Sequence, residues 1–203
     1  MLLKTRFDFN LKTNRLSLSC LIILATHNSY TMKNLFLLSA IIFSSSVFGQ
    51  TDVFSAARSG DTEAIAKLYM LNADTINAEN QQGYTPVILA CYYDQTAVLK
   101  VLMQYKVELN EKPNSPTALQ AAAYKGFTDC VKLLLDYGAN PNIADANGTT
   151  PLIYAVQFSH TEIVDLLLKK GASVNYKDPN GFTAINYAEN LGLTEILALL
   201  KSN

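Results

Sequence analysis

The apolar positions between residues 148 and 175 predict two short helices joined by a turn. Thr150 and Pro151 suit the N-cap and first helical position of the first helix. In the second helix, apolar residues recur at helical spacing: Ile163, Val164, Leu167 and Leu168. Gly171 ends this helix, because glycine adopts the left-handed conformation at little cost. Neither helix can bury its apolar face alone, so the pair requires neighbours of the same kind.

The same pattern recurs along the chain with a period of about 33 residues. Three registers keep this spacing: Ala56, Ala90, Ala122, Ala155 and Ala188; Thr62, Thr96, Thr128, Thr161 and Thr194; and Leu68, Leu102, Leu134, Leu167 and Leu200. A fourth consists of Asn77, Asn110, Asn142 and Asn175, each in the linker before a new repeat. We expect the Ala to allow close helix packing, the Thr to cap the second helix, and the Leu to fill the core. Such a period indicates a solenoid of stacked helix pairs.

The residues that open and close each unit resemble ankyrin repeats. The resemblance rests on Thr85-Pro86-Val87-Ile88-Leu89-Ala90 and Thr150-Pro151-Leu152-Ile153-Tyr154-Ala155, and on Gly138-Ala139-Asn140-Pro141-Asn142 and Gly171-Ala172-Ser173-Val174-Asn175. It covers about residues 51–203. It implies an all-α ankyrin-repeat solenoid, with helix-turn-helix units joined by β-hairpin-like loops. The expected units are a leading half-repeat over 51–77 and repeats over 78–110, 111–142, 143–175 and 176–203.

The chain departs from the family pattern in two ways. Where the family has His after Thr-Pro-Leu, this chain has Ile88, Gln120, Ile153 and Asn186, so we expect the side-chain hydrogen bond to the Thr to be weak or absent. The loop over 112–116 is one residue shorter than the others.

The first 49 residues do not continue the repeat. From Met32 a basic residue, a short apolar run and small residues up to Gly49 describe a secretory signal peptide. The apolar run is shorter than the roughly 20 residues that a membrane span needs, although an anchor is the alternative reading. We expect translation to start at Met32, residues 1–31 to be an unstructured over-extension, and the mature chain to begin at Gln50 in the periplasm or outside the cell.

The charge of residues 50–203 argues against binding nucleic acid or an anionic membrane. The chain has 16 basic and 17 acidic residues, of which five and one precede residue 50, so the remainder carries 11 minus 16, or −5. Phosphate binding draws most of its affinity from Lys and Arg.

The residue types of a catalytic or metal site are scarce. His160 is the single histidine after residue 50, in the turn before a second helix, and we expect it to stabilise that turn. Cys91 and Cys130 fall in apolar registers and should be buried thiols, with a disulfide as the alternative. No phosphate-binding glycine loop occurs. We therefore expect no enzyme activity, cofactor or metal.

The ankyrin resemblance places partner binding on the loop tips and the ends of the first helices. The candidate residues there are Arg58, Gln82, Tyr84, Tyr92, Tyr93, Asn114, Tyr124, Lys125, Asn147, Gln157, Phe158, Asn180 and Phe182. Six are aromatic, which suits an interface, although some rings could instead seal adjacent repeats. Tyr92 and Tyr93 beside Tyr124 should form a continuous aromatic strip.

The leading functional hypothesis is an exported protein-binding module. The alternatives are an inhibitor or immunity-type protein that blocks a toxin or hydrolase, and an accessory protein of a periplasmic redox enzyme such as catalase. The last of these follows from the resemblance alone. The sequence does not name the partner, because a fold does not fix its function.

Overall fold

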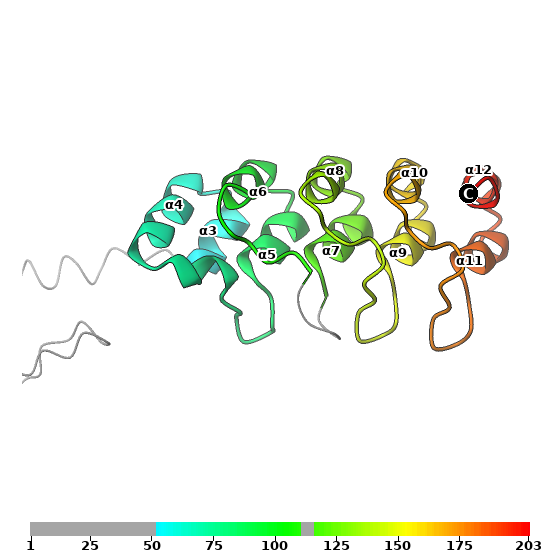
Figure 1. Ribbon diagram of the computed structural model, residues 1–203, viewed down its shortest axis with the longest axis horizontal. Coiled ribbons are helices and arrows are strands. Elements are labelled where there is room, and N and C mark those ends of the chain that lie inside the picture. Colours follow the sequence, from blue (N-terminus) through cyan, green and yellow to red (C-terminus); the bar gives the residue numbers. More distant parts are fainter. Residues whose placement is uncertain (1–51, 111–115) are drawn as a thin grey trace, which may run out of the picture. The chain divides into compact units, whose positions relative to one another are not determined.

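The computed structural model describes residues 52–110 and 116–203, which form stacked helix pairs (Figure 1). These residues contain ten α-helices, one 3-10 helix and no β-strand, so the all-α repeat fold is confirmed. The first helices are α3 (Val53–Ser59), α5 (Pro86–Tyr92), α7 (Ala118–Lys125), α9 (Pro151–Gln157) and α11 (Ala184–Asn190). The second helices are α4 (Thr62–Leu71), α6 (Thr96–Leu102), α8 (Thr128–Asp136), α10 (Thr161–Lys169) and α12 (Thr194–Lys201).

The helices lie in two rows, with the pairs following one another in sequence order (Figure 1). The extensive contacts between elements all join helices of one repeat or of adjacent repeats. The leading unit contains a complete pair, α3 and α4, followed by the 3-10 helix η1 (Ala73–Asn77). The predicted signal peptide and the start at Met32 lie outside the described residues.

Threonine caps four of the five first helices. The hydroxyl oxygens of Thr85, Thr117, Thr150 and Thr183 each accept a hydrogen bond from the backbone N–H three residues later. Such a bond satisfies one of the helix's unpaired donors. Pro86 and Pro151 occupy the first helical position, where no N–H is needed.

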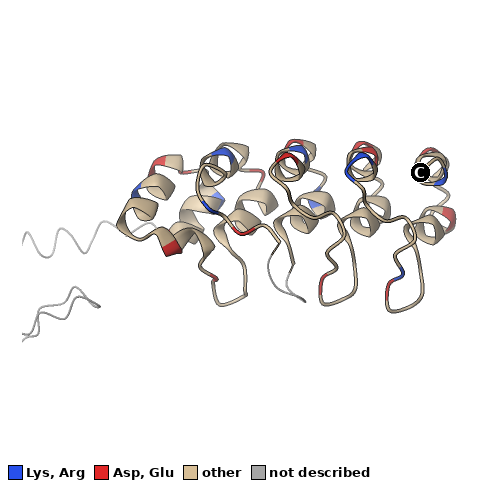
Figure 2. Cartoon of the chain, in the orientation of Figure 1, with Lys and Arg blue, Asp and Glu red and all other residues tan. Residues whose placement is uncertain are grey.

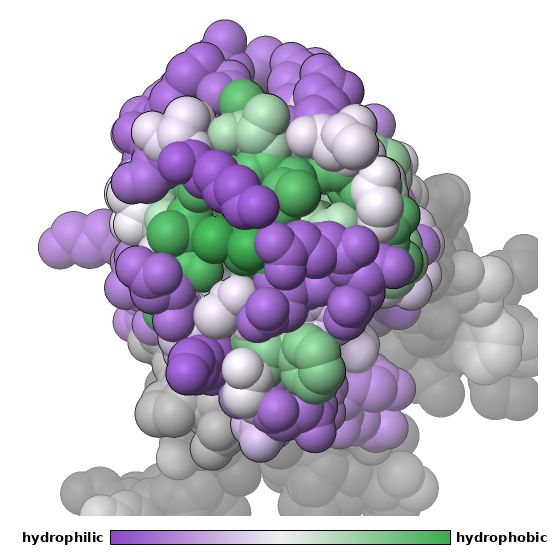
Figure 3. Space-filling view, turned by 90° about the vertical axis from the view of Figure 1, so that its right-hand side faces the viewer, coloured by the Kyte–Doolittle hydropathy of each residue, from purple (hydrophilic) through white to green (hydrophobic). Residues whose placement is uncertain are grey.

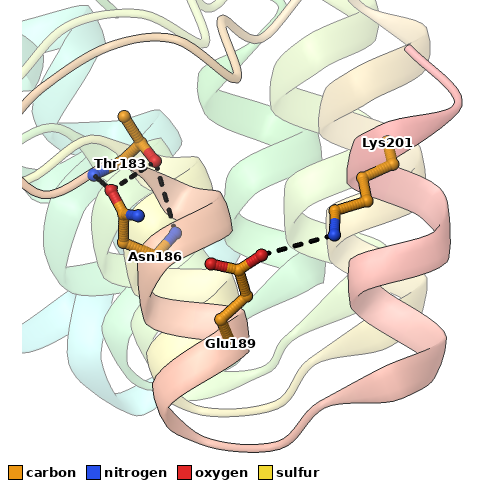
Figure 4. A network of polar contacts seen from close by, with 4 residues as sticks. All are labelled: Thr183, Asn186, Glu189 and Lys201. Carbon is orange, nitrogen blue, oxygen red and sulfur yellow. Dashed lines mark hydrogen bonds and ion pairs between the residues drawn. The ribbon is translucent and has the colours of Figure 1, made fainter.

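The expected loss of the family's cap hydrogen bond is wrong for two repeats. The Gln120 side-chain oxygen accepts from the Thr117 N–H at 2.6 Å, and Asn186 accepts from the Thr183 N–H at 3.0 Å (Figure 4). Each pair forms a capping box, because an amide oxygen can return a bond to the N-cap backbone. Ile88 and Ile153 have no polar side-chain atom with which to do this.

The prediction that threonine caps the second helices is also wrong, by one residue. The Thr of each second helix is its first helical residue, and the N-cap is the residue before it. The chain reaches this position through a tight turn in which the Thr N–H donates to the carbonyl two residues back, as from Thr128 to Gly126 at 3.1 Å. That carbonyl belongs to a residue with positive φ in all five turns: Gly60, Asp94, Gly126, Ser159 and Gly192.

The Ala and Leu registers form the core. All five Ala residues of the register have no solvent-exposed surface, which allows the paired helices to approach closely. The Leu residues of the register are buried from Leu102 onward. Leu68 is only partly buried, because within the described part of the chain α4 has a second-row neighbour on one side only, α6.

The Asn register joins consecutive repeats through paired hydrogen bonds. Asn142 donates from its amide nitrogen to the Gly171 carbonyl at 3.0 Å and accepts from the Ser173 N–H at 2.8 Å. Asn77 and Asn110 make the same two bonds to the repeat that follows each of them. These three residues form an asparagine ladder along the linkers.

The end of the stack formed by α11 and α12 exposes apolar surface bordered by hydrophilic residues (Figure 3). Leu191 is exposed, and Ile185 and Leu197 are partly buried. An ion pair joins the two helices, with Lys201 Nζ 3.3 Å from Glu189 Oε1 (Figure 4). Both side chains are about half exposed, so this pair contributes little to stability.

Candidate functional site

An open pocket of about 420 Å³ lies along the first helices of the leading repeats. Its lining residues come from the end of α3, from α5, α7 and α9, and from the segments before α5 and α7: Arg58, Asn80, Gln82, Tyr84, Ile88, Leu89, Tyr92, Tyr93, Pro116, Gln120, Ala121, Tyr124 and Tyr154. Because five of the thirteen are tyrosines, we call it the tyrosine pocket. Its volume is within the range of small-ligand and side-chain binding sites.

The repeat register positions the side chains around this pocket. Arg58 lies in the last turn of α3, Tyr92 ends α5 and Tyr124 lies in the last turn of α7. The core alanine of each first helix lies two residues before these positions, at Ala56, Ala90 and Ala122. Because the alanine faces the core, the residue two positions later faces the open side of the row of first helices.

Aromatic contacts connect the predicted strip. The Tyr92 and Tyr93 rings meet edge-on with centroids 5.4 Å apart. The Lys125 ammonium lies 4.1 Å from the Tyr92 ring centroid and 5.7 Å from that of Tyr124. On the far side the Tyr124 ring contacts Phe158, with centroids 4.6 Å apart. Lys125 therefore bridges α5 and α7, and the strip is continuous from Tyr93 to Phe158.

The structure brings part of the predicted binding set together. Six members line the tyrosine pocket: Arg58, Gln82, Tyr84, Tyr92, Tyr93 and Tyr124. Lys125 and Phe158 adjoin it through the ring contacts just described. The remaining described members do not line it: Asn147, Gln157, Asn180 and Phe182. Asn114 lies outside the described residues. The six predicted aromatic side chains are all exposed, between 37 and 48%.

Several lining residues were not predicted. Ile88, Leu89, Ala121 and Tyr154 occupy apolar positions of first helices and look like core in the sequence. The signal that could have identified them is the fourth helical position: Leu89 in α5, Ala121 in α7, Tyr154 in α9 and Tyr187 in α11. Tyr154 and Tyr187 place a ring at this position, whereas Ala121 places only a methyl group at the pocket wall.

A tyrosine–aspartate bond ties each of the last two loops to its helix. The Tyr154 hydroxyl donates to Asp145 Oδ2 at 2.7 Å, and the Tyr187 hydroxyl donates to Asp178 Oδ2 at 2.6 Å. The other oxygen of each carboxylate accepts two backbone N–H groups of its own loop. Burial and the Asp145 carboxylate raise the pKa of Tyr154 to about 12. The Tyr187 hydrogen bond lowers the pKa of Asp178.

The remaining reactive groups have structural contacts. The His160 ring lies 3.4 Å from the Tyr124 carbonyl oxygen, so it links two repeats at the turn. Gln95 makes the equivalent contact, donating to the Arg58 carbonyl at 3.0 Å. Cys91 and Cys130 are buried free thiols. Burial raises the pKa of Cys91, and a hydrogen bond with Cys91 lowers the pKa of Cys130.

Residues 52–110 and 116–203 show neither a metal cluster nor a membrane span. Nowhere in these ranges do three or more His, Cys, Asp or Glu side chains gather closely enough to hold a metal ion. No helix within them is long and apolar enough to cross a bilayer.

Comparison with known proteins agrees with the geometry. The family model described as ankyrin repeats (3 copies) matches residues 20–113, 53–145, 107–178 and 141–203. Tyrosine-protein kinase HTK16 of Hydra vulgaris is 31% identical over 150 residues, which are 71% of this chain and 19% of that protein. Alpha-latrotoxin-Lh1a of Latrodectus hasselti is 31% identical over 113 residues, 54% of this chain and 8% of the toxin.

Ankyrin repeat and SOCS box protein 2 of Mus musculus is also similar, at 33% identity over 110 residues, 53% of this chain and 17% of that protein. The chain thus spans less than a fifth of the length of each of these three relatives. The matched helix pairs, the 33-residue period and the family model lead to one assignment. The chain belongs to the ankyrin-repeat family.

Proposed function

We propose that this protein is a non-catalytic binding module that holds a partner protein against the tyrosine pocket and the adjoining aromatic strip. Ankyrin repeats generally mediate protein–protein interaction and are typically non-catalytic. The observation that carries the proposal is the cluster of exposed tyrosines around an open pocket, with Arg58 at its edge. Tyrosine and arginine are enriched among the residues that dominate interface energies.

The test is the double substitution Tyr93→Ala with Tyr124→Ala. Partner recovered by the tagged protein from its native cells should fall roughly tenfold or more, because each ring is an interface anchor. Thermal unfolding should change little, because Tyr93 is 48% and Tyr124 39% exposed and neither belongs to the buried core. Tyr137→Ala is the matched control, since Tyr137 is 54% exposed at the end of α8 and does not line the pocket. Undiminished recovery by a folded double variant would exclude this surface as the binding site.

Export is the second part of the proposal. The signal-like stretch from Met32 to Gly49 supports delivery to the periplasm or the medium. Fractionation of the native cells followed by N-terminal sequencing should find the protein outside the cytoplasm, with Gln50 as its first residue. A cytoplasmic protein that retains residues 32–49 would overturn this part and leave the binding proposal unaffected.

A further inference from the structure

The tyrosine pocket lies beside first helices that carry Leu89 and Ala121 at a position occupied by tyrosine in α9 and α11. At the fourth position of the first helix, α9 and α11 carry Tyr154 and Tyr187, whose hydroxyls bond to loop aspartates. In α7 this position is Ala121, which is 8% exposed at the pocket wall. A tyrosine ring at this position would occupy space that is empty in α7.

The charged residues of the first helices beside the pocket are of one sign. The four helices α3, α5, α7 and α9 contain just two charged residues, Arg58 and Lys125, both basic. Figure 2 shows this row mostly uncharged, with blue segments in α3 and α7. Among the described residues, no aspartate or glutamate lines the pocket. Glu79 lines a separate small cavity beside the same loop, and Asp145 accepts the hydroxyl hydrogen bond of Tyr154. The row is thus locally basic, whereas residues 50–203 carry a net charge of −5.

The buried polar group of the pocket is already satisfied. Gln120 donates from its amide nitrogen to the carbonyls of Ile143 and Thr149 and accepts from the Thr117 N–H. Both of its amide N–H donors are therefore used within the protein. The other polar side chains are the Arg58 guanidinium, the Lys125 ammonium beside the pocket, the Asn80 and Gln82 amides, and the tyrosine hydroxyls. Of these hydroxyls, that of Tyr154 already donates to Asp145. All of the charged groups among them favour a carboxylate.

We propose that the tyrosine pocket binds an extended acidic segment of the partner protein, with one apolar side chain over Ala121 and carboxylates at Arg58 and Lys125. This inference rests on the proposed function and specifies its partner. An apolar anchor removes the surface of Ala121, Leu89 and the tyrosine rings from water. The flanking carboxylates fix the position of the bound segment along the pocket. They also raise its association rate, since the two cations are exposed and solvated.

Synthetic peptides test the proposal with the purified protein. The probe is a fluorescent ten-residue peptide with one central phenylalanine flanked by glutamates, and its binding is followed by anisotropy. One comparison peptide has lysines in place of the glutamates, and the other has alanine in place of the phenylalanine. Both should bind roughly tenfold or more weakly than the probe, since each lacks one of the two elements that the pocket recognises. Equal or tighter binding of the lysine peptide would overturn the proposal, and so would failure of all three to bind.

The substitution Ala121→Tyr tests the pocket itself. It introduces the residue that α9 and α11 carry at the same helical position, so the helix geometry tolerates it. Affinity for the acidic probe should fall roughly tenfold, because the ring fills the anchor site. Arg58→Gln with Lys125→Gln should weaken binding of the acidic probe several-fold and reduce the salt dependence of that binding. Lys100→Gln and Lys132→Gln on the second-helix row are the charge-matched controls and should have no effect.

The two proposals fail in different ways. If the native partner is lost with Tyr93→Ala and Tyr124→Ala but is unaffected by Ala121→Tyr, the binding surface stands and the acidic-segment inference is wrong. If neither set of changes affects the partner, the proposed function itself is wrong. Normal circular dichroism of Ala121→Tyr is required for either conclusion, and Ala121→Leu serves as a smaller filling substitution if the tyrosine variant does not fold.

Discussion

At the scale of single residues, the most informative positions are those with a left-handed backbone. The turn between the two helices of each repeat needs positive φ, and three repeats use glycine there. Asp94 and Ser159 adopt the same conformation with φ of 56° and 59°. A residue with a Cβ atom is strained in this region, although aspartate tolerates it better than most. Among the five turn residues with positive φ, Ser159 is therefore the one least suited to this backbone conformation.

Ser159→Gly should stabilise the protein by about 0.5–1 kcal/mol. Relief of the left-handed conformation gains about 1–2 kcal/mol, and the greater unfolded-state entropy of glycine removes part of it. Urea unfolding measures the difference. The reciprocal change Gly126→Ser should destabilise, since an added Cβ would also lie 2.6 Å from the His160 ring. Equal stability of Ser159→Gly and the wild type would show that the surrounding turn relieves the strain.

The tyrosine–aspartate bonds make stability depend on alkaline pH. The folded-state pKa of Tyr154, about 12, is above the ordinary value of 10, so folding favours the protonated phenol. This contribution is complete below pH 10 and is lost as the pH rises toward 12. Tyr154→Phe should remove the part of the alkaline destabilisation that comes from this phenol. A denaturant midpoint measured at intervals across that range, for both proteins, checks the difference.

At the scale of elements, the linkers contribute specific hydrogen bonds in addition to those at the helix termini. Each residue of the asparagine ladder pairs with one carbonyl and one N–H of the next repeat, in positions where the backbone has no helical partner. This accounts for the recurrence of Asn at a spacing that helix periodicity alone does not require. The ladder fixes the distance between successive linkers.

Asn142→Ala should destabilise the protein by about 1–2 kcal/mol. It removes two hydrogen bonds, each with a net contribution of about 0.5–1.5 kcal/mol, from a partly solvated linker. Lys132→Ala, an exposed change on α8, is the control and should stay within about 0.5 kcal/mol of the wild type. Chemical denaturation of the three proteins decides the matter, and an unaffected Asn142→Ala would mean that water replaces both bonds.

How far the sequence could predict these elements depends on which interaction defines them. The helix pairs, the Thr-Pro starts and the buried Ala residues follow from spacing and local propensity, and they are confirmed. The predicted N-cap position of Thr128 and its equivalents was wrong by one residue. The hydrogen bond from the Thr N–H to the carbonyl two residues back determines the turn and makes the Thr the first helical residue. The capping role of Gln120 was missed because the family's histidine was taken as the reference.

The candidate site likewise contains residues that could be identified from the sequence and residues that could not. The aromatic positions at helix ends could be identified because the repeat leaves them outside the core registers. Ala121 and Tyr154 could not, since an alanine on an apolar face looks the same whether it packs against a neighbour or lines a pocket. Only the side chains around it decide which of the two holds.

At the scale of the whole molecule, the stack is held together by contacts between neighbours. Within the described residues, each helix packs extensively only against helices of its own and adjacent repeats. Stability in such an array is the sum of repeat terms and of terms between neighbours. The apolar interface between α9 and α11 is therefore the last of a series of equivalent interfaces.

Removal of residues 176–203 should leave the preceding helices folded but less stable. The truncated protein loses α11 and α12 and exposes the α9 and α10 faces that they cover. Circular dichroism should show a loss of helical signal in proportion to the residues removed, with a lower unfolding midpoint. Complete loss of helical structure would show that the repeats fold only as one cooperative unit.

The asparagine ladder also governs how the protein responds to mechanical load. Its bonds cross from one linker to the next and no further, so a pull applied at the two ends loads every junction equally and each junction can yield separately. A repeat that yields releases about 33 residues of chain, roughly 110–120 Å when fully extended, without loosening units beyond its neighbour. Stretching a single molecule should therefore give a series of similar small extensions instead of one rupture.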